Sequence, residues 1–210
     1  MRCNNTFPCH INNLNYSVDN FHIIKNLSFK ISEKPITIIS GPNGIGKTTL
    51  LKILAGIINP CSGNIEYRNG NFSGEISFLL QNTVFFNTTL LENLLYIKKI
   101  KKLNHKFDLK LEKYLNMFEL NHLLNRYPSE LSGGEQQIFS FIRSLLQSPT
   151  LFFLDEPFQN LDRERKKIVE NIIENISLTC KIIMVSHDYP NLPKASIEIL
   201  KFNNDSINQA

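Results

Sequence analysis

A glycine-rich stretch near the start of the chain carries the clearest chemical signal in the sequence. It fits the phosphate-loop pattern GxxxxGK[ST] and reads Gly41, Pro42, Asn43, Gly44, Ile45, Gly46, Lys47, Thr48 and Thr49. The β-branched segment 36–39 before it predicts a buried strand, and segment 49–55 predicts a helix. Glycines let several backbone N–H groups point at phosphate oxygens, and a helix N-terminus adds roughly half a positive charge there. The order of strand, loop and helix therefore predicts binding of a nucleoside triphosphate.

Two side chains of this loop indicate how the phosphates and a metal ion would be held. Lys47 is expected to reach the phosphates. The Thr48 hydroxyl is the expected ligand for Mg²⁺, which keeps most of its waters and takes further ligands from phosphate oxygens. The alternative is a glycine turn that only caps a helix, and it does not explain the full pattern together with its flanks.

A second motif precedes an amphipathic helical pattern in the second half of the chain. It consists of Leu131, Ser132, Gly133, Gly134 and Glu135, followed by two glutamines. A serine helix cap would explain Ser132 but not the two glycines. With both motifs present, the chain resembles the ATP-binding cassette (ABC) ATPases. In that family a signature of this type lies at a helix N-terminus and binds the γ-phosphate of the ATP held by the opposite subunit.

A third segment places two carboxylates after four apolar residues, 151–154. A central strand that ends in an active site has this pattern, and the segment resembles the Walker B element of the family. The resemblance places Asp155 in the Mg²⁺ shell, mostly through water. It makes Glu156 the group that polarises the attacking water and accepts its proton. A buried strand followed by an acidic turn is the simpler alternative.

Smaller elements follow in the order that the resemblance requires. Gln81, after the apolar segment 76–80, matches the Q-loop glutamine, which senses Mg²⁺ and water and joins the catalytic core to the helical subdomain. Asp162 matches the D-loop at the dimer interface, and it also suits an N-cap for the next helix. His187, after the predicted strand 182–185, matches the switch histidine that hydrogen-bonds the γ-phosphate. The resemblance thus implies Glu156, His187 and Gln81 as catalytic residues, and Thr48, Gln81 and Asp155 as residues around Mg²⁺.

An aromatic side chain is expected to stack on the adenine ring. Tyr16, in the first predicted strand, resembles the family's stacking residue, and Phe21 is the alternative. Either ring suits the role, because stacking on a flat π-face contributes about 1–3 kcal/mol per base with little dependence on sequence.

Composition limits the remaining possibilities. The 210 residues, 42% of them hydrophobic, fit a single ABC ATPase domain over 1–210. No apolar run reaches the roughly 20 residues that span a bilayer, and the N-terminus lacks a signal-peptide core. A cytoplasmic protein is therefore expected, held at the inner face of the membrane through another polypeptide.

Charge and cysteine content argue against two other classes of protein. The net charge is +4, but the lysines are scattered except at 98–102, which is interpreted as solvated surface. No nucleic-acid partner is expected. The four cysteines show no CxxC pair and no secretory context, so reduced thiols are expected.

The pattern along the chain predicts an α/β fold. A P-loop NTPase (RecA-like) core with a mainly parallel sheet would carry an N-terminal antiparallel β-region and an inserted α-helical subdomain at about 88–147. Ile138 departs from the family pattern, because relatives usually place arginine there. The departure puts in doubt a buried polar contact that supports the signature helix.

The resemblance implies a mechanism for a stand-alone cassette subunit. Two cassettes, expected to be a homodimer, would close head to tail on two ATP molecules and reopen after hydrolysis. Coupled to a separate transmembrane permease subunit, this motion would transport an unknown substrate. A soluble ABC ATPase of a scaffold complex, such as iron–sulfur cluster assembly, is the alternative. A purely structural ATP-binding protein is disfavoured because Glu156 and His187 are both present.

Overall fold

A computed structural model describes residues 6–19, 21–68, 70, 72, 74–101, 105–187, 190–203 and 206–209. The strands are β1 (Cys9–Val18), β2 (Phe21–Ile31), β3 (Ile36–Ser40), β4 (Ser62–Tyr67), β5 (Ile76–Leu79), β6 (Leu151–Asp155), β7 (Lys181–Val185), β8 (Ile197–Asn203) and β9 (Ser206–Gln209). The α-helices are α1 (Lys47–Leu54), α2 (Leu90–Lys101), α3 (His105–Met117), α4 (Gly133–Leu145) and α5 (Arg163–Ser177).

The larger sheet has 6 strands in the order β5-β6-β7-β3-β8-β9. Its neighbours from β5 to β8 are parallel, and β9 is antiparallel to β8. Strand β6 shows how both faces of this sheet are buried. Phe152 and Leu154 belong to one hydrophobic cluster, whereas Leu151 and Phe153 belong to the other. A parallel sheet covered on both faces requires such continuous apolar strands.

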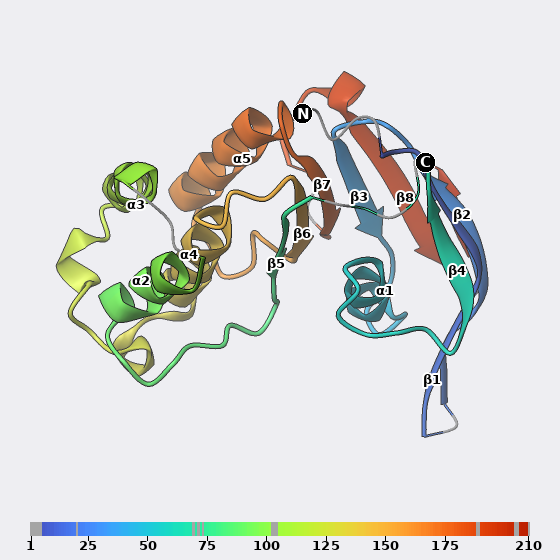
Figure 1. The fold of residues 1–210 in the computed structure, drawn as a ribbon, viewed down its shortest axis with the longest axis horizontal. Helices are drawn as coiled ribbons and strands as arrows, with labels where there is room; N and C mark the ends of the chain where they lie inside the picture. The colour runs from blue at the N-terminus through green and yellow to red at the C-terminus, as the bar shows by residue number, and fades with distance from the viewer. Residues whose placement is uncertain are drawn as a thin grey trace.

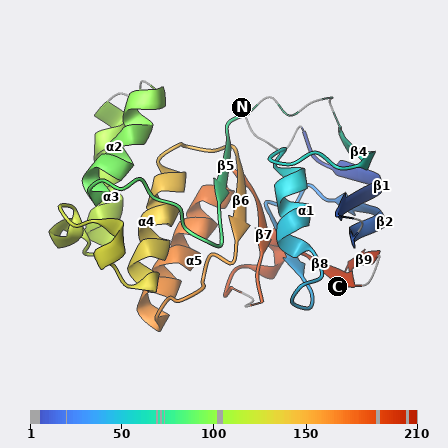
Figure 2. The same ribbon diagram turned by 90° about the horizontal axis from the view of Figure 1, so that it is seen from below.

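The smaller sheet is antiparallel, has 3 strands and runs in the order β2-β1-β4. Helix α1 lies between the two sheets (Figure 1, Figure 2). Leu50 and Leu51 of α1 are completely buried in the cluster that joins this helix to both sheets. The first part of the chain thus forms the expected antiparallel β-region, packed on the core.

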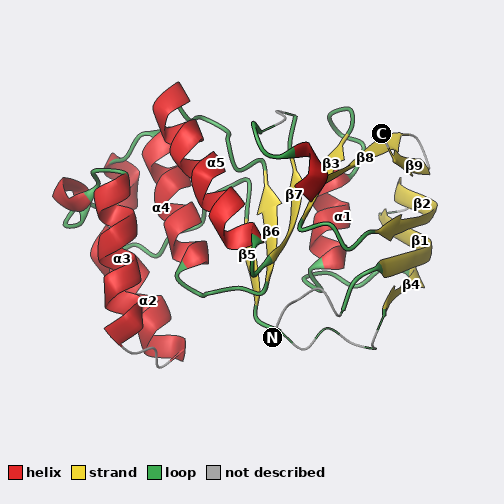
Figure 3. Cartoon of the chain, turned by 90° about the horizontal axis from the view of Figure 1, so that it is seen from above, coloured by secondary structure: helices red, strands yellow, loops and turns green. Residues whose placement is uncertain are grey.

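Helices α2, α3, α4 and α5 gather on the other side of the larger sheet (Figure 3). Helix α2 begins at Leu90 and α4 ends at Leu145, and both residues lie within the range 88–147 that was expected to be helical. Ile138 is fully buried in the hydrophobic cluster that α4 shares with β6 and α5. An apolar contact therefore fills the position where the family pattern has arginine.

The structure shows the surroundings of the lysine cluster at 98–102 and of the cysteines. Lys98 pairs with Asp108, and Lys101 pairs with Glu75, while Lys102 lies outside the described residues. Among the described residues, Cys9, Cys61 and Cys180 form no disulfide, and Cys3 also lies outside the described part. Within the described ranges, no helix has both the length and the apolar character that crossing a bilayer requires.

Candidate functional site

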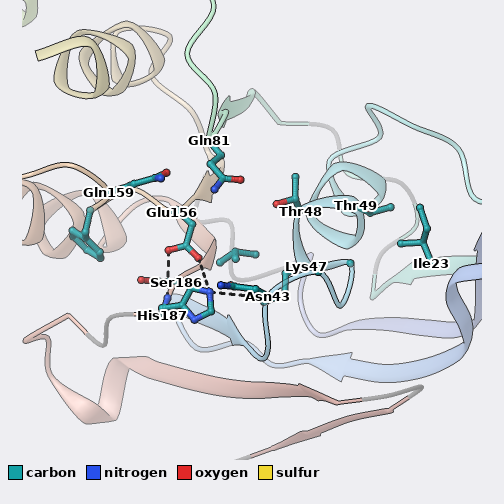
Figure 4. Close-up of a pocket in the computed structure, with 14 residues that line it drawn as sticks. Ile23, Asn43, Lys47, Thr48, Thr49, Gln81, Glu156, Gln159, Ser186 and His187 are labelled. Carbon is teal, nitrogen blue, oxygen red and sulfur yellow. Dashed lines mark hydrogen bonds and ion pairs between the residues drawn. The ribbon is translucent and has the colours of Figure 1, made fainter. Parts of the chain in front are cut away.

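Most of the candidate site residues lie at one edge of the larger sheet. Parallel strands β5, β6, β7 and β3 are neighbours, and their carboxyl ends meet at this edge. Gln81 follows β5, Asp155 ends β6 with Glu156 directly after it, and His187 follows β7. The loop after β3 is the glycine-rich stretch. Figure 4 shows the side chains of Gln81, Glu156 and His187 pointing into a common space.

This space is a cavity of about 670 Å³. Its lining includes Asn43, Lys47, Thr48, Gln81, Glu156 and His187. Both the α1 end of the loop and the ends of β5, β6 and β7 therefore face the same volume. A triphosphate with a coordinated ion needs such a mixture of donors and carboxylates.

The glycine-rich loop leaves the first turn of α1 open to an anion. Gly46 precedes α1 with a left-handed φ of 101°, and no side chain caps this helix end. A Cβ atom on Gly41 would lie 2.3 Å from the carbonyl oxygen of Phe202, so only glycine fits there. Lys47, Thr48 and Thr49 of the first turn line the cavity, and the helix end has no capping side chain, as in anion-binding helix termini.

Lys47 is the first residue of α1 and is buried. Its Nζ donates to the carbonyl oxygens of Gly41, at 2.8 Å, and Pro42, at 2.9 Å. It also lies 3.3 Å from His187 Nε2. Burial lowers the pKa of Lys47, and the charge of Glu156 opposes this shift. The ammonium group is therefore held by the loop itself, within reach of the carboxylate at the end of β6.

Asp155 and Thr48 form the part of the site that suits a cation. Asp155 is fully buried, and its Oδ1 accepts a hydrogen bond from Thr48 Oγ1 at 3.1 Å. Its Oδ2 is buried and has no hydrogen-bond partner among the described residues. Burial raises the pKa of Asp155, and the bond from Thr48 opposes this shift. An unsatisfied carboxylate oxygen beside a hydroxyl fits Mg²⁺, which needs few protein ligands when phosphates supply the others.

Glu156 has an unusual backbone conformation and a polarised carboxylate. Its φ is 49°, in the left-handed region, and its N–H donates to the carbonyl oxygen of Val185 at 2.9 Å. The His187 N–H donates to Glu156 Oε2 at 3.4 Å, and His187 Nε2 lies 3.5 Å from Oε1. Burial raises the pKa of Glu156, while the bond and charge of His187 oppose the shift. A raised pKa makes a carboxylate a better proton acceptor near neutral pH.

The signature residues form the start of α4 and do not line this cavity. Ser132 is the N-cap of α4, and Glu135 Oε2 accepts from both its N–H, at 2.8 Å, and its Oγ, at 2.7 Å. These bonds lower the pKa of Glu135. Asp162 caps α5 by accepting from the Arg165 N–H at 2.8 Å, so the capping role expected for it is confirmed. Within one chain, the signature and the cavity are separate surfaces.

The two candidates for adenine stacking lie on the paired strands β1 and β2. Tyr16 lies in β1 opposite Ile24 and packs against the hydrophobic core. Phe21 begins β2 and is 78% exposed. Neither lines the cavity, whereas Ile23 does. No pattern in the sequence distinguishes Ile23, because an apolar residue in a strand looks like any other core residue.

Comparison with known proteins shows the family to which this chain belongs. The family model described as ABC transporter matches residues 24–159, which hold the glycine-rich loop, the signature and Glu156. This chain belongs to the ABC transporter family. It is 34% identical to the lipoprotein-releasing system ATP-binding protein of Buchnera aphidicola, over 89% of both proteins.

The other similar proteins differ in the share of their own length that this chain covers. The chain is 33% identical to the sulfate/thiosulfate import ATP-binding protein of Mesostigma viride, over 95% of this chain. It spans only about 60% of the length of that relative. A solved ATP-binding subunit of an ABC transporter superposes with a TM-score of 0.81 at 19% identity, covering 97% of this chain and 90% of that one. This likeness confirms the expected α/β fold with its mainly parallel sheet.

Proposed function

We propose that this chain binds and hydrolyses ATP as the nucleotide-binding subunit of a transporter. The observation that carries the proposal is the convergence of Lys47, Thr48, Glu156 and His187 on one cavity at the carboxyl edge of the parallel sheet. Residues 1–210 would act as one cassette domain. The transport proteins among its relatives support the assignment to transport rather than to a scaffold complex.

The residues would divide the chemistry among them. The triphosphate would lie over the N-terminus of α1, and Lys47 would exchange its bonds to the Gly41 and Pro42 carbonyls for bonds to phosphate oxygens. The Glu156 carboxylate would accept the proton of the attacking water. His187 and Gln81, which also line the cavity, would orient the γ-phosphate and that water.

Thr48 and Asp155, with Gln81 nearby, would hold Mg²⁺. The Asp155 Oδ2 atom without a hydrogen-bond partner supports this assignment. When bound, the ion would neutralise negative charge on the phosphate oxygens.

A second cassette would complete the site. Because Leu131–Glu135 do not line the cavity of their own chain, they would serve the ATP held by a partner cassette, and Asp162 would lie near that interface. A homodimer arranged head to tail satisfies this requirement with one sequence. Each ATP would then hold two subunits together, and hydrolysis would release them.

A transmembrane permease would dock beside α2. A groove of about 340 Å³ lies there, and exposed apolar side chains line it, among them Val84, Phe86, Tyr96 and Ile100. Exposed apolar patches of this kind mark protein contacts. The chain would therefore work at the cytoplasmic face of the membrane, and the transported substrate would be selected by the permease.

Two variants test the chemistry, with Glu112→Gln on the exposed face of α3 as the matched control. Glu156→Gln should bind ATP normally but lose turnover by about 10²-fold or more. Lys47→Ala should lose nucleotide binding, and Glu112→Gln should retain both properties. Steady hydrolysis by Glu156→Gln, measured as phosphate release, would remove Glu156 from the mechanism.

The partner is tested by purifying Glu156→Gln from its own cells with ATP and a mild detergent, followed by mass spectrometry. A multi-span membrane protein at stoichiometric yield, lost in Lys47→Ala, is the expected result. Recovery with soluble scaffold proteins alone would contradict the transport assignment.

A further inference from the structure

The side chain of Gln137 connects the signature helix to the end of β6. It is almost completely buried, and its Nε2 donates to the carbonyl oxygen of Glu156 at 3.2 Å. The neighbouring Gln136 amide donates instead to the carbonyl oxygens of Pro128 and Leu131. Of these adjacent glutamines, Gln137 is therefore the one whose amide bonds the backbone of Glu156.

The Glu156 backbone needs such support. A non-glycine residue in the left-handed region is strained and persists only where its surroundings fix it. The N–H of Glu156 is held by Val185, and its carbonyl accepts from Gln137 and from the N–H of Gln159 at 3.2 Å. The Gln137 amide thus helps to set the peptide from which the Glu156 side chain projects toward His187.

A second contact joins the same helix to the same segment. A Cβ atom on Gly134 would lie 2.6 Å from the carbonyl oxygen of Asn160, which shows how closely α4 approaches the backbone there. Gly134 and Gln137 are three residues apart and share one face of α4. This face of α4 therefore contacts both ends of the segment 156–160, with Gln137 at Glu156 and Gly134 at Asn160.

We propose that Gln137 is a positioning residue that couples the signature of this chain to its own Glu156 carboxylate. The inference rests on the proposed function, in which Ser132 and Gly134 meet the ATP of a partner cassette. Gln137 lies about 7.5 Å along the helix from Ser132, at 1.5 Å per residue. When the signature of this chain binds the partner's ATP, Gln137 would then position Glu156, whose carboxylate acts on this chain's own ATP. Each cassette would in this way contribute to both ATP sites of the dimer.

Gln137→Met tests the proposal, because methionine keeps the length of the side chain and removes the amide donor. We expect kcat for ATP hydrolysis to fall by about tenfold to a hundredfold, with KM unchanged within about twofold, as for a misplaced catalytic group. Ser144→Ala is the matched control. Ser144 is buried on the same helix and loses its bonds to the carbonyl oxygens of Ser140 and Phe78 instead. It should lower the melting temperature and leave kcat unchanged.

Gln137→Glu separates hydrogen-bond donation from packing and guards against a misfolded methionine variant. Its side chain has the same shape but donates a hydrogen bond only when protonated. Its kcat relative to the unaltered protein should rise as the pH falls, whereas the ratio for Gln137→Met should stay level.

The outcomes distinguish this proposal from the proposed function. Hydrolysis by the unaltered protein with an unchanged kcat in Gln137→Met would overturn the role of Gln137 alone. An equal loss of kcat in Ser144→Ala would also overturn it, because any loosening of α4 would then suffice. If the unaltered protein bound ATP but did not hydrolyse it, the proposed function would fail and this inference with it.

Discussion

A buried lysine at the opposite edge of the larger sheet allows a sharp prediction about stability. Lys181 begins β7, is 4% exposed, and its Nζ donates to the carbonyl oxygens of Ser32, at 3.0 Å, and Lys34. It also donates to Thr37 Oγ1 at 2.8 Å. The Thr37 hydroxyl in turn donates to Glu198 Oε2 at 3.0 Å. One hydroxyl thus links a buried ammonium group to a buried carboxylate.

The predicted magnitude follows from what Lys181→Met leaves behind. It removes three donated hydrogen bonds and the positive charge near Glu198, whose carboxylate keeps the hydrogen bonds from the Thr37 hydroxyl and the Ser32 N–H. Removing one partner of a buried charge network costs about 3–5 kcal/mol of the free energy of unfolding. The control is Lys98→Met. Lys98 pairs with Asp108, but these side chains are 36% and 41% exposed, so about 0–1 kcal/mol should be lost. The double variant Lys181→Met, Glu198→Leu should recover most of the loss.

The pH dependence of the free energy of unfolding provides an independent test of the Lys181 network. Burial lowers the pKa of Lys181 to about 8 from an ordinary 10.5, against the charge of Glu198. The unfolded chain then binds this proton more tightly, so the contribution of Lys181 to stability falls by about 3 kcal/mol as the pH drops from 10.5 to 8. Cys9 and Tyr67, whose pKa values burial raises to about 12, titrate in both proteins. The charge of Lys181 also lowers the pKa of Cys9, so the difference between the unaltered protein and Lys181→Met reports Lys181 together with its coupling to Cys9.

Urea unfolding at several pH values measures both effects. If Lys181→Met lost no more stability than Lys98→Met, the buried network would not support the sheet and the reasoning would be refuted.

Three further predictions concern the proposed site. Because burial raises the pKa of Glu156 above the ordinary 4.5, kcat/KM for ATP should fall with the loss of the carboxylate form at a pH above 4.5; a limb at or below that value contradicts its role as base. Gly134→Ala would place a Cβ atom 2.6 Å from the Asn160 carbonyl oxygen, so kcat should fall about tenfold with ATP binding retained, and an unchanged kcat would show that α4 does not constrain this loop. Alanine at Tyr16 or Phe21 should weaken ATP affinity by about 1–3 kcal/mol at whichever ring stacks on adenine, with triphosphate affinity unchanged. If both variants bound ATP as tightly as the unaltered protein, both rings would be excluded.

Local signals in the sequence were sufficient for the fold and for the framework of the site. The loop 41–49 was recognisable because its glycines and flanks are contiguous, and the strand 151–154 was recognisable as a continuous apolar run. The cap at Asp162 was predictable for the same reason, since an N-cap acts within one helical turn.

Long-range polar contacts were not predictable. Lys181 meets Thr37 across most of the chain, and Gln137 meets the Glu156 carbonyl on another element. Apolar periodicity reports which faces are buried, but it does not report which polar group meets which partner. The left-handed backbone of Glu156 was equally hidden, because glycine and asparagine are the usual residues in that conformation.

The order of the strands has a consequence for how such a site survives changes in sequence. Strands β5, β6, β7 and β3 lie side by side, so their terminal residues are spaced by backbone hydrogen bonds, about 4.8 Å from one strand to the next. A slip of one residue in any of these strands would displace its terminal group by about 3.3 Å, farther than a proton transfer tolerates. Buried side chains beneath the site can therefore be exchanged for others of similar volume as long as the strands keep their register. This explains how a protein with 19% identical residues keeps the same framework over 97% of this chain.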